Sequence, residues 1–182
     1  MKKFSKWRFQ SIENKFDGHI SKSVLQYKEM QSLIGNISQW FINESATVYN
    51  LGSSTCETEK HIMLYNPDAK IDFYSIDINK KMLNIGKKKL LKYKKKNHKV
   101  YFQKRDLNNI TFKKSNIIIS LLTTPFISKQ NRDNLFKKTF KSLKNEGAFI
   151  LVEKTEAKNS FFQDIFSQIL DENKIKKKLN FK

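Results

Sequence analysis

Short runs of β-branched and aromatic residues alternate with longer stretches in which apolar residues recur every three or four positions. The short runs predict strands at 47–51, 70–76, 99–103, 117–122 and 148–152. The longer stretches predict helices near 56–65, 80–93, 129–144 and 159–171. Buried strands separated by helices are typical of a parallel sheet that is covered on both faces. The pattern therefore predicts a doubly wound, Rossmann-like α/β fold with a mostly parallel sheet.

The segments around this alternation carry other patterns. Residues 1–20 mix polar and aromatic side chains without a period, so we expect an irregular lead-in there. Helical spacing within 21–46 predicts an N-terminal helix. Residues 47–154 are the expected sheet core, and 155–182 a C-terminal helix and basic tail. Residues 145–147 are expected to form a turn before the last strand. A chain of 182 residues fits a single domain over 1–182.

The chain is organised around the strand, turn and helix that run from Thr47 to Glu59. A glycine at the end of the strand, Gly52, would let a ligand approach the backbone near the N-terminus of the helix. The next predicted strand is followed by Asp77, where Rossmann-type folds hold ribose hydroxyls. Together they predict a nucleotide site, and a plain serine-capped turn is the alternative. One glycine instead of three argues against NAD.

The charge suggests a polyanionic partner. The formal net charge is +19, from 36 basic and 17 acidic residues, and such a balance attracts RNA or DNA. The alternative is compositional, because arginine contributes only Arg8, Arg105 and Arg132 while Lys, Asn and Ile are all abundant, as in AT-rich coding sequence. The lysines would attract phosphates in either case.

Other features of the composition limit the cellular compartment and the ligands that we expect. Cys56 is the only cysteine, so no internal disulfide can form and a reducing compartment is the default. No apolar run approaches the roughly 20 residues that span a bilayer, and the basic N-terminus has no apolar segment behind it. We therefore expect a cytoplasmic protein without a membrane partner. The histidines His19, His61 and His98 lack metal-ligand spacing, so no metal is expected.

Several segments resemble the class I S-adenosylmethionine-dependent methyltransferases over roughly residues 20–165. Residues 48–54 resemble the family's Val-Tyr-Asp-Leu-Gly-Cys-Ser loop, and residues 76–82 its second-strand acid with a Pro-Ala-Met-type helix start. Residues 143–154 resemble its Leu-x-Pro-Gly-Gly segment, which ends in Glu-Lys. Within the class, the chain is most similar to the tRNA uridine-34 carboxymethyltransferase (CmoA) group, in a C-terminally shortened form whose last strands are missing.

The resemblance implies S-adenosylmethionine as cofactor and assigns residues to its methionine part. Gly52, Ser53 and Ser54 would line that part through backbone groups. Tyr27 would reach the methionine end, and Leu121 stands where the family places an asparagine near the cofactor.

The resemblance also assigns residues to the adenosine part. Asp77 would accept both ribose hydroxyls, and Ile78 would pack on adenine. Asp106 and Leu107 would flank the adenine edge. Two positions near the loop depart from the family pattern, because Asn50 replaces an acid and Cys56 replaces a glycine.

These observations predict an S-adenosylmethionine-dependent methyltransferase whose acceptor is tRNA or another nucleic acid. Methyl transfer depends chiefly on orientation, so no triad is required and no catalytic residue is assigned. Residues 123–125 follow the fourth strand, where acceptor contacts usually lie in this fold class. The alternative is a catalytically degenerate homologue that binds the cofactor, RNA or a partner. An exposed sheet edge would favour a homo-oligomer.

Overall fold

The computed structural model describes residues 13–176, and its centre is a sheet of five parallel strands. The strands are β1 (Ser45–Leu51), β2 (Lys70–Asp77), β3 (His98–Lys104), β4 (Ser115–Leu121) and β5 (Leu143–Val152). Their order across the sheet is β3-β2-β1-β4-β5. All four pairings are parallel, so the predicted doubly wound α/β fold is confirmed.

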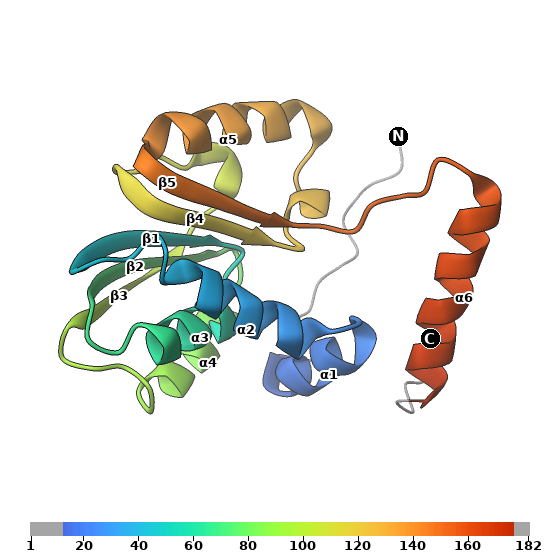
Figure 1. Ribbon diagram of the computed structural model, residues 1–182, viewed down its shortest axis with the longest axis horizontal. Helices are drawn as coiled ribbons and strands as arrows, with labels where there is room; N and C mark the ends of the chain where they lie inside the picture. Colours follow the sequence, from blue (N-terminus) through green and yellow to red (C-terminus); the bar gives the residue numbers. More distant parts are fainter. Residues whose placement is uncertain (1–12, 177–182) are drawn as a thin grey trace.

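Helices precede, separate and follow the strands (Figure 1). The α-helices are α1 (Phe16–Ser23), α2 (Tyr27–Ser38), α3 (Glu57–Tyr65), α4 (Lys80–Leu90), α5 (Lys129–Ser142) and α6 (Ser160–Lys176). The 3₁₀ turns are η1 (Glu13–Lys15), η2 (Leu107–Asn109) and η3 (Thr124–Phe126). None of the helices in residues 13–176 is long and apolar enough to cross a membrane.

The two faces of the sheet have separate apolar cores, because successive side chains of a strand point to opposite faces. On one face, Ile34 of α2, Ile62 of α3 and Leu90 of α4 pack with strand residues such as Phe73. On the other face, Leu135 of α5 packs with a second set of strand residues. Figure 1 shows α2, α3 and α4 on one side of the sheet and α5 on the other.

The strand order places the candidate site. The chain runs from β1 to β2 and β3 on one side, and then returns to place β4 on the other side of β1. Ligands of open α/β sheets bind outside the carboxyl ends of the strands at such a reversal. Gly52, Asp77 and Thr123 each follow or end a strand at this edge.

The predicted N-terminal helix over 21–46 is wrong in its extent. Two helices replace it, because Gln26 adopts a left-handed backbone (φ 53°) between them, and the second ends at Ser38. The first begins at Phe16, whose buried side chain anchors part of the predicted irregular lead-in. The rest of the predicted lead-in, residues 1–12, and the end of the basic tail, 177–182, lie outside the described residues.

The turn predicted at residues 145–147 is also wrong, because these residues lie inside β5. The strand begins at Leu143 and is irregular near Glu146, which has a φ of 62°. The register with β4 shifts at the same place, between the pairs that Ser115 and Ile117 make. A local irregularity of this kind bends a strand without ending it.

The last helix lies apart from the sheet. Figure 1 shows α6 beyond an extended segment that follows β5, beside α1. The Asn173 side chain donates to the carbonyl oxygen of Lys22 at 3.5 Å. No residue of α6 is buried. Several large apolar side chains of this helix are therefore exposed, among them Phe161, Phe162 and Phe166.

Candidate cofactor site

The loop after β1 is fixed to β2 by its own backbone. The N–H groups of Gly52 and Ser53 both donate to the carbonyl oxygen of Ile76, at 2.9 and 2.8 Å. Gly52 has a φ of +74°, which favours glycine. These two N–H groups therefore hold the loop in place, and the predicted backbone lining of the methionine part would come from the remaining atoms of the loop.

Thr123, after β4, packs directly against Gly52. A Cβ on Gly52 would overlap the Thr123 side chain, and Thr123 Oγ1 donates to the carbonyl oxygen of Leu51 at 2.9 Å. Glu153, after β5, holds Thr123 in turn, because its Oε1 accepts from the N–H groups of Thr123 (3.0 Å) and Thr124 (2.8 Å). The strand ends of β1, β4 and β5 are thus joined by side chains, and Gly52 is needed for packing as well as for its φ.

Asp77 is the acid that the sequence placed at the end of β2. Its Oδ2 accepts from the N–H of Ser54 at 2.8 Å, and its Oδ1 accepts from the N–H of Asn79 at 2.8 Å. Burial raises the pKa of Asp77 above its ordinary value, and these N–H groups act in the opposite direction. The two carboxylate oxygens together have about four lone-pair sites, so acceptor capacity remains for a further donor. The adjacent Ile78 is 67% exposed and available for an apolar ligand surface.

Asn50 is part of a buried hydrogen-bonded group. Its Nδ2 donates to Oε2 of Glu59 at 2.8 Å, and Ser75 Oγ donates to the other oxygen of Glu59 at 2.5 Å. Glu59 is fully buried in α3, and burial raises its pKa, which the hydrogen bonds from Ser75 and Asn50 oppose. A second acid at position 50 would repel this carboxylate. Asn50 therefore suits a position that faces a buried acid, because its amide donates to Glu59.

Cys56 has a left-handed backbone (φ 59°) at the start of α3, a conformation that favours glycine. Its side chain is fully buried and points toward α4. A Cβ on Gly86 would lie 2.5 Å from the Cys56 sulfur. The bulk of Cys56 is thus accommodated by a glycine on the neighbouring helix.

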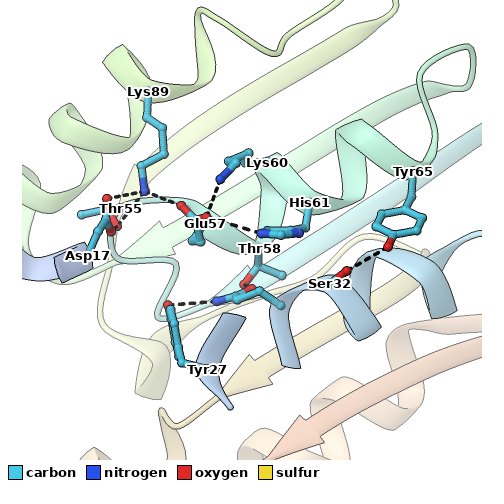
Figure 2. A network of polar contacts seen from close by, with 11 residues as sticks. Asp17, Tyr27, Ser32, Thr55, Glu57, Thr58, Lys60, His61, Tyr65 and Lys89 are labelled. Atoms are coloured by element: carbon cyan, nitrogen blue, oxygen red, sulfur yellow. Dashed lines mark hydrogen bonds and ion pairs between the residues drawn. The ribbon is translucent and has the colours of Figure 1, made fainter. Parts of the chain in front are cut away.

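Tyr27 is connected to α3 through one glutamine. The Tyr27 hydroxyl accepts from Gln31 Nε2 at 2.9 Å, and Gln31 Oε1 accepts from Thr58 Oγ1 at 2.9 Å (Figure 2). Burial raises the pKa of Tyr27, so the phenol stays protonated at neutral pH. A pocket of about 100 Å³ lies beside it, with Asp17 and Glu57 among its lining residues. This volume suits one end of a ligand, since whole small-molecule sites occupy about 300–1,000 Å³.

Two of the residues that line this pocket, Asp17 and Glu57, belong to an ion-pair network (Figure 2). Lys89 Nζ of α4 lies 2.6 Å from Oδ2 of Asp17 in α1 and 2.8 Å from Oε2 of Glu57 in α3. Glu57 also pairs with Lys60 at 2.6 Å. Burial opposes ionisation of Glu57, but hydrogen bonds from His61, Lys60 and Lys89 hold its pKa well below the ordinary value. Lys89 thereby connects α1 to α3 and α4 through ion pairs.

The remaining predicted residues lie at the same edge of the sheet. Asp106 caps η2, since its Oδ1 accepts from the N–H of Asn108 at 2.9 Å. Leu107 packs on the apolar core that α5 covers. Leu121 ends β4 and packs on the core of the opposite face. Their assignment to the cofactor stays a prediction.

Asp17, Glu57 and Lys89 were not identified from the sequence. Their spacing follows no motif, and Lys89 is one of 36 basic residues. Only the packing of α1, α3 and α4 brings the three charges together. No local signal could have found them.

The described residues fit S-adenosylmethionine. Asp77 retains acceptor capacity for ribose hydroxyls, and Ile78 offers an exposed apolar side chain next to it. Ser54 Oγ is buried and has no hydrogen-bond partner within residues 13–176. A buried hydroxyl without a partner is unfavourable unless a ligand or water satisfies it.

Comparison with known proteins gives the family. The sequence profile of the ubiE/COQ5 methyltransferase family matches residues 6–172. The chain belongs to the ubiE/COQ5 methyltransferase family. The predicted enzyme class, a methyltransferase, and the predicted cofactor, S-adenosylmethionine, are confirmed at the level of this family.

Curated relatives of this methyltransferase-family chain carry a more specific name. It is 29% identical over 180 residues to a carboxy-S-adenosyl-L-methionine synthase of Staphylococcus epidermidis, which covers 96% of this chain and 75% of that protein. It is 30% identical over 145 residues to the enzyme of the same name from Campylobacter hominis, which covers 80% of this chain and 60% of the relative. The predicted similarity to the CmoA group is confirmed. The relatives' name refers to making a carboxylated cofactor and names no tRNA acceptor.

Solved structures confirm the fold of the methyltransferase family. A putative S-adenosyl-L-methionine-dependent methyltransferase from Methanococcus maripaludis aligns with a TM-score of 0.60 at 17% identity, over 88% of this chain and 69% of that one. The plantazolicin methyltransferase BpumL, in complex with SAH, aligns with a TM-score of 0.61 at 17% identity. The alignment covers 96% of this chain and 64% of BpumL.

Proposed function

We propose that this chain binds S-adenosylmethionine across the carboxyl ends of β1, β2 and β4 and transfers its methyl group to an acceptor. Asp77 is the observation that supports this most directly. Backbone N–H groups fix its carboxylate, which has about four lone-pair sites and so keeps acceptor capacity for the cofactor's ribose. Ile78 and Leu107 would contact adenine, and Tyr27 would face the methionine end.

The described residues would contribute position more than acid–base chemistry. S-adenosylmethionine supplies a methyl group on a positively charged sulfur, which an electron-rich acceptor atom attacks in line. Holding the reactants in this geometry provides much of the rate. Thr123 and Glu153 fix the segment after β4, where we expect the acceptor to lie. A general base is required only for a protonated, poorly nucleophilic acceptor.

Isothermal titration with S-adenosylhomocysteine tests the cofactor site. Asp77→Ala should weaken binding by roughly 10- to 100-fold, because hydrogen bonds to a charged group are lost. Asp68→Ala removes an exposed acid from the turn before β2 and should change nothing. The two variants should have similar circular dichroism spectra. Equal affinity of Asp77→Ala and wild type would contradict the proposed site.

We further propose a nucleic acid as the acceptor, with tRNA as the first to test. The support is the net charge of +19, since Lys-rich surfaces attract phosphates. Incubation with methyl-labelled cofactor and a pool of RNA should give label that nuclease digestion releases. Label found only in a protein or small-molecule fraction would refute the nucleic acid and keep methyl transfer.

The names of the relatives favour a second candidate, the conversion of S-adenosylmethionine into its carboxylated form. In that case the product is a modified cofactor, and no label reaches a macromolecule. Mass spectrometry of the cofactor after incubation with a cell extract separates the two activities. In the carboxylated form, a carboxyl group supplied by a small molecule of the extract has replaced one hydrogen of the cofactor, which raises its mass. A third outcome, tight S-adenosylhomocysteine binding with neither product, would support the catalytically degenerate homologue.

A further inference from the structure

Three tyrosines form a stacked row across the sheet, on the face that α5 partly covers. Tyr49 of β1 pairs in register with Tyr74 of β2, and Tyr74 pairs with Tyr101 of β3. The ring centroids of the first pair lie 4.5 Å apart, with 11° between the ring planes. Those of the second pair lie 4.9 Å apart at 20°. Both distances match the roughly 4.8 Å separation of neighbouring strands.

The row ends at an open position. β3 is the edge of the sheet, and no strand of residues 13–176 pairs with its outer side. Tyr101 is 41% exposed, whereas Tyr49 and Tyr74 are buried. Its only ring contact within residues 13–176 is with Tyr74. The next place in the stack, one strand spacing beyond Tyr101, is therefore available to a planar group from outside.

Cationic side chains lie along the row and beside its open end. Lys113 Nζ lies 5.5 Å from the centroid of the Tyr74 ring, and the Lys113 N–H donates to the Tyr49 hydroxyl at 3.1 Å. A hydrogen bond with the Tyr74 hydroxyl raises the pKa of Lys113, so this amine is charged at neutral pH. Lys99 is exposed two residues before Tyr101 and lies on the same face of β3.

One further cation connects this region to the cofactor site. Arg105 follows β3 and is exposed, and its N–H donates to the carbonyl oxygen of Asp77 at 3.1 Å. Arg105 therefore connects the strand that carries Tyr101 to the strand end that would hold the ribose. Lys99, Tyr101, Arg105 and Lys113 together are called the Tyr101 surface.

We propose that the Tyr101 surface binds a single-stranded segment of nucleic acid, with one base stacked on Tyr101 and the neighbouring phosphates held by Lys99, Arg105 and Lys113. Aromatic stacking combined with cations along the backbone is how single strands are bound without sequence preference. Base faces are free to stack only where the strand is unpaired. This inference rests on the nucleic-acid acceptor proposed above and specifies which form of nucleic acid is bound and where.

Fluorescence anisotropy with a short labelled single-stranded RNA, without cofactor, tests the stacking. Tyr101→Ala should weaken binding by roughly 5- to 100-fold, whereas Tyr101→Phe, which keeps the ring, should stay within about twofold of wild type. Trp40→Ala is the matched control, because it removes an aromatic side chain that is 83% exposed at the end of α2. A duplex of the same sequence should bind more weakly and should not respond to Tyr101→Ala.

The salt dependence tests the cations. Lys113→Gln should reduce the slope of log affinity against log salt by about 0.7, the value for one phosphate contact on a single strand. Lys87→Gln removes an equal charge from α4, on the other face of the sheet, and should leave the slope nearly unchanged. An equal reduction of the salt slope in Lys113→Gln and Lys87→Gln would show that RNA is attracted by diffuse charge and would overturn the proposal.

The result stays separable from that for the cofactor site. Unchanged RNA affinity in Tyr101→Ala overturns the Tyr101 surface, even if S-adenosylhomocysteine binds and methyl transfer occurs. Conversely, the Tyr101 surface is supported if Tyr101→Ala loses affinity for RNA while Asp77→Ala binds RNA as wild type does. This holds even if no methyl transfer is detected. Tyr101→Ala should also bind S-adenosylhomocysteine as wild type does, which shows that the variant is folded.

Discussion

The sulfur of Cys56 in the loop before α3 occupies the space that a side chain on Gly86 of α4 would need. A Cβ on Gly86 would lie 2.5 Å from that sulfur and 3.0 Å from the Cβ of Cys56. The two residues are 30 positions apart, yet each permits the other. The pair explains how the loop accommodates a side chain at position 56.

Gly86→Ala should therefore lower the free energy of unfolding by about 1–3 kcal/mol, the usual cost of overpacking a core. Urea unfolding measures the loss. The same change in a Cys56→Gly background should cost less, because the sulfur and its Cβ are gone, and the coupling should be about 0.5–3 kcal/mol. Strictly additive losses would show that the two side chains do not compete for space.

Asn50→Asp should destabilise the protein at neutral pH, because it places a second carboxylate against buried Glu59 and removes a donor. We expect a loss of about 1–3 kcal/mol in urea unfolding, and a smaller loss at mildly acidic pH, where the pair can share a proton. Asn50→Asp combined with Glu59→Gln restores one acid and one amide and should recover most of the stability. A stable single variant at pH 7 would contradict this account.

Glu59 itself should make the wild type pH-dependent. Its folded pKa is raised above the unfolded value, so the native state holds its proton more tightly. The free energy of unfolding should therefore rise as pH falls from the folded pKa toward about 4.3, the ordinary glutamate value. Glu59→Gln should remove this part of the pH dependence.

Lys89→Met should release α1, because it removes the cation that Asp17 and Glu57 share. Hydrogen exchange of residues 16–23 should become faster, while exchange in β1 and β2 should change little. Lys88→Met removes an exposed lysine of the same helix and is the control. Slow exchange in α1 of Lys89→Met would mean that apolar contacts, such as those of Phe16, hold the helix without the ion pairs.

Glu153→Ala should weaken S-adenosylhomocysteine binding, because the N–H groups of Thr123 and Thr124 lose their acceptor and Thr123 is freed from its position against Gly52. We expect up to about a tenfold loss in titration calorimetry, equal to roughly 1.4 kcal/mol. Glu153→Gln keeps an acceptor oxygen and should lose less. Lys154→Ala, at the next and exposed position, should have no effect, and identical affinities in all variants would contradict the role of Glu153.

The outer edge of β5, with which no strand of residues 13–176 pairs, should mediate self-association, as unpaired strand edges do. Light scattering after size exclusion should detect a homo-oligomer. Leu151→Lys places a charge on this strand, at a side chain 45% exposed, and should shift the protein toward monomer. Leu64→Lys, on α3 at 52% exposure, should leave the mass unchanged. A wild-type monomer at every concentration would contradict this prediction.

The strands, the order of elements and the places of Gly52 and Asp77 at strand ends could be predicted from the sequence because their signals are local. The apolar run at residues 117–119 is continuous, as in a strand buried on both faces. Gly52 and Asp77 stand at ends of such runs, and the sheet then places them at one edge. The period of the apolar residues and the residues at the ends of the apolar runs were sufficient to predict the order of strands and helices.

The remaining features depend on contacts between distant segments. The sequence around Gln26 does not predict the left-handed backbone of this residue, which separates α1 from α2. Glu146 and Gly147 have the composition of a turn, but the pairs that Leu143 and Ala148 make with β4 on either side keep them within a strand. The role of Lys89 requires three helices to be in place. Local propensity was overridden by tertiary packing in each case.

The position of α6 has a consequence for how the two ends of the described chain respond to ionic strength. α6 contacts α1 through Asn173 and Lys22, and α1 is fastened in turn by Asp17 and Lys89. Salt screens charge pairs that are partly open to water. Concentrated salt should therefore loosen the first and the last helix together, while the sheet between them stays intact.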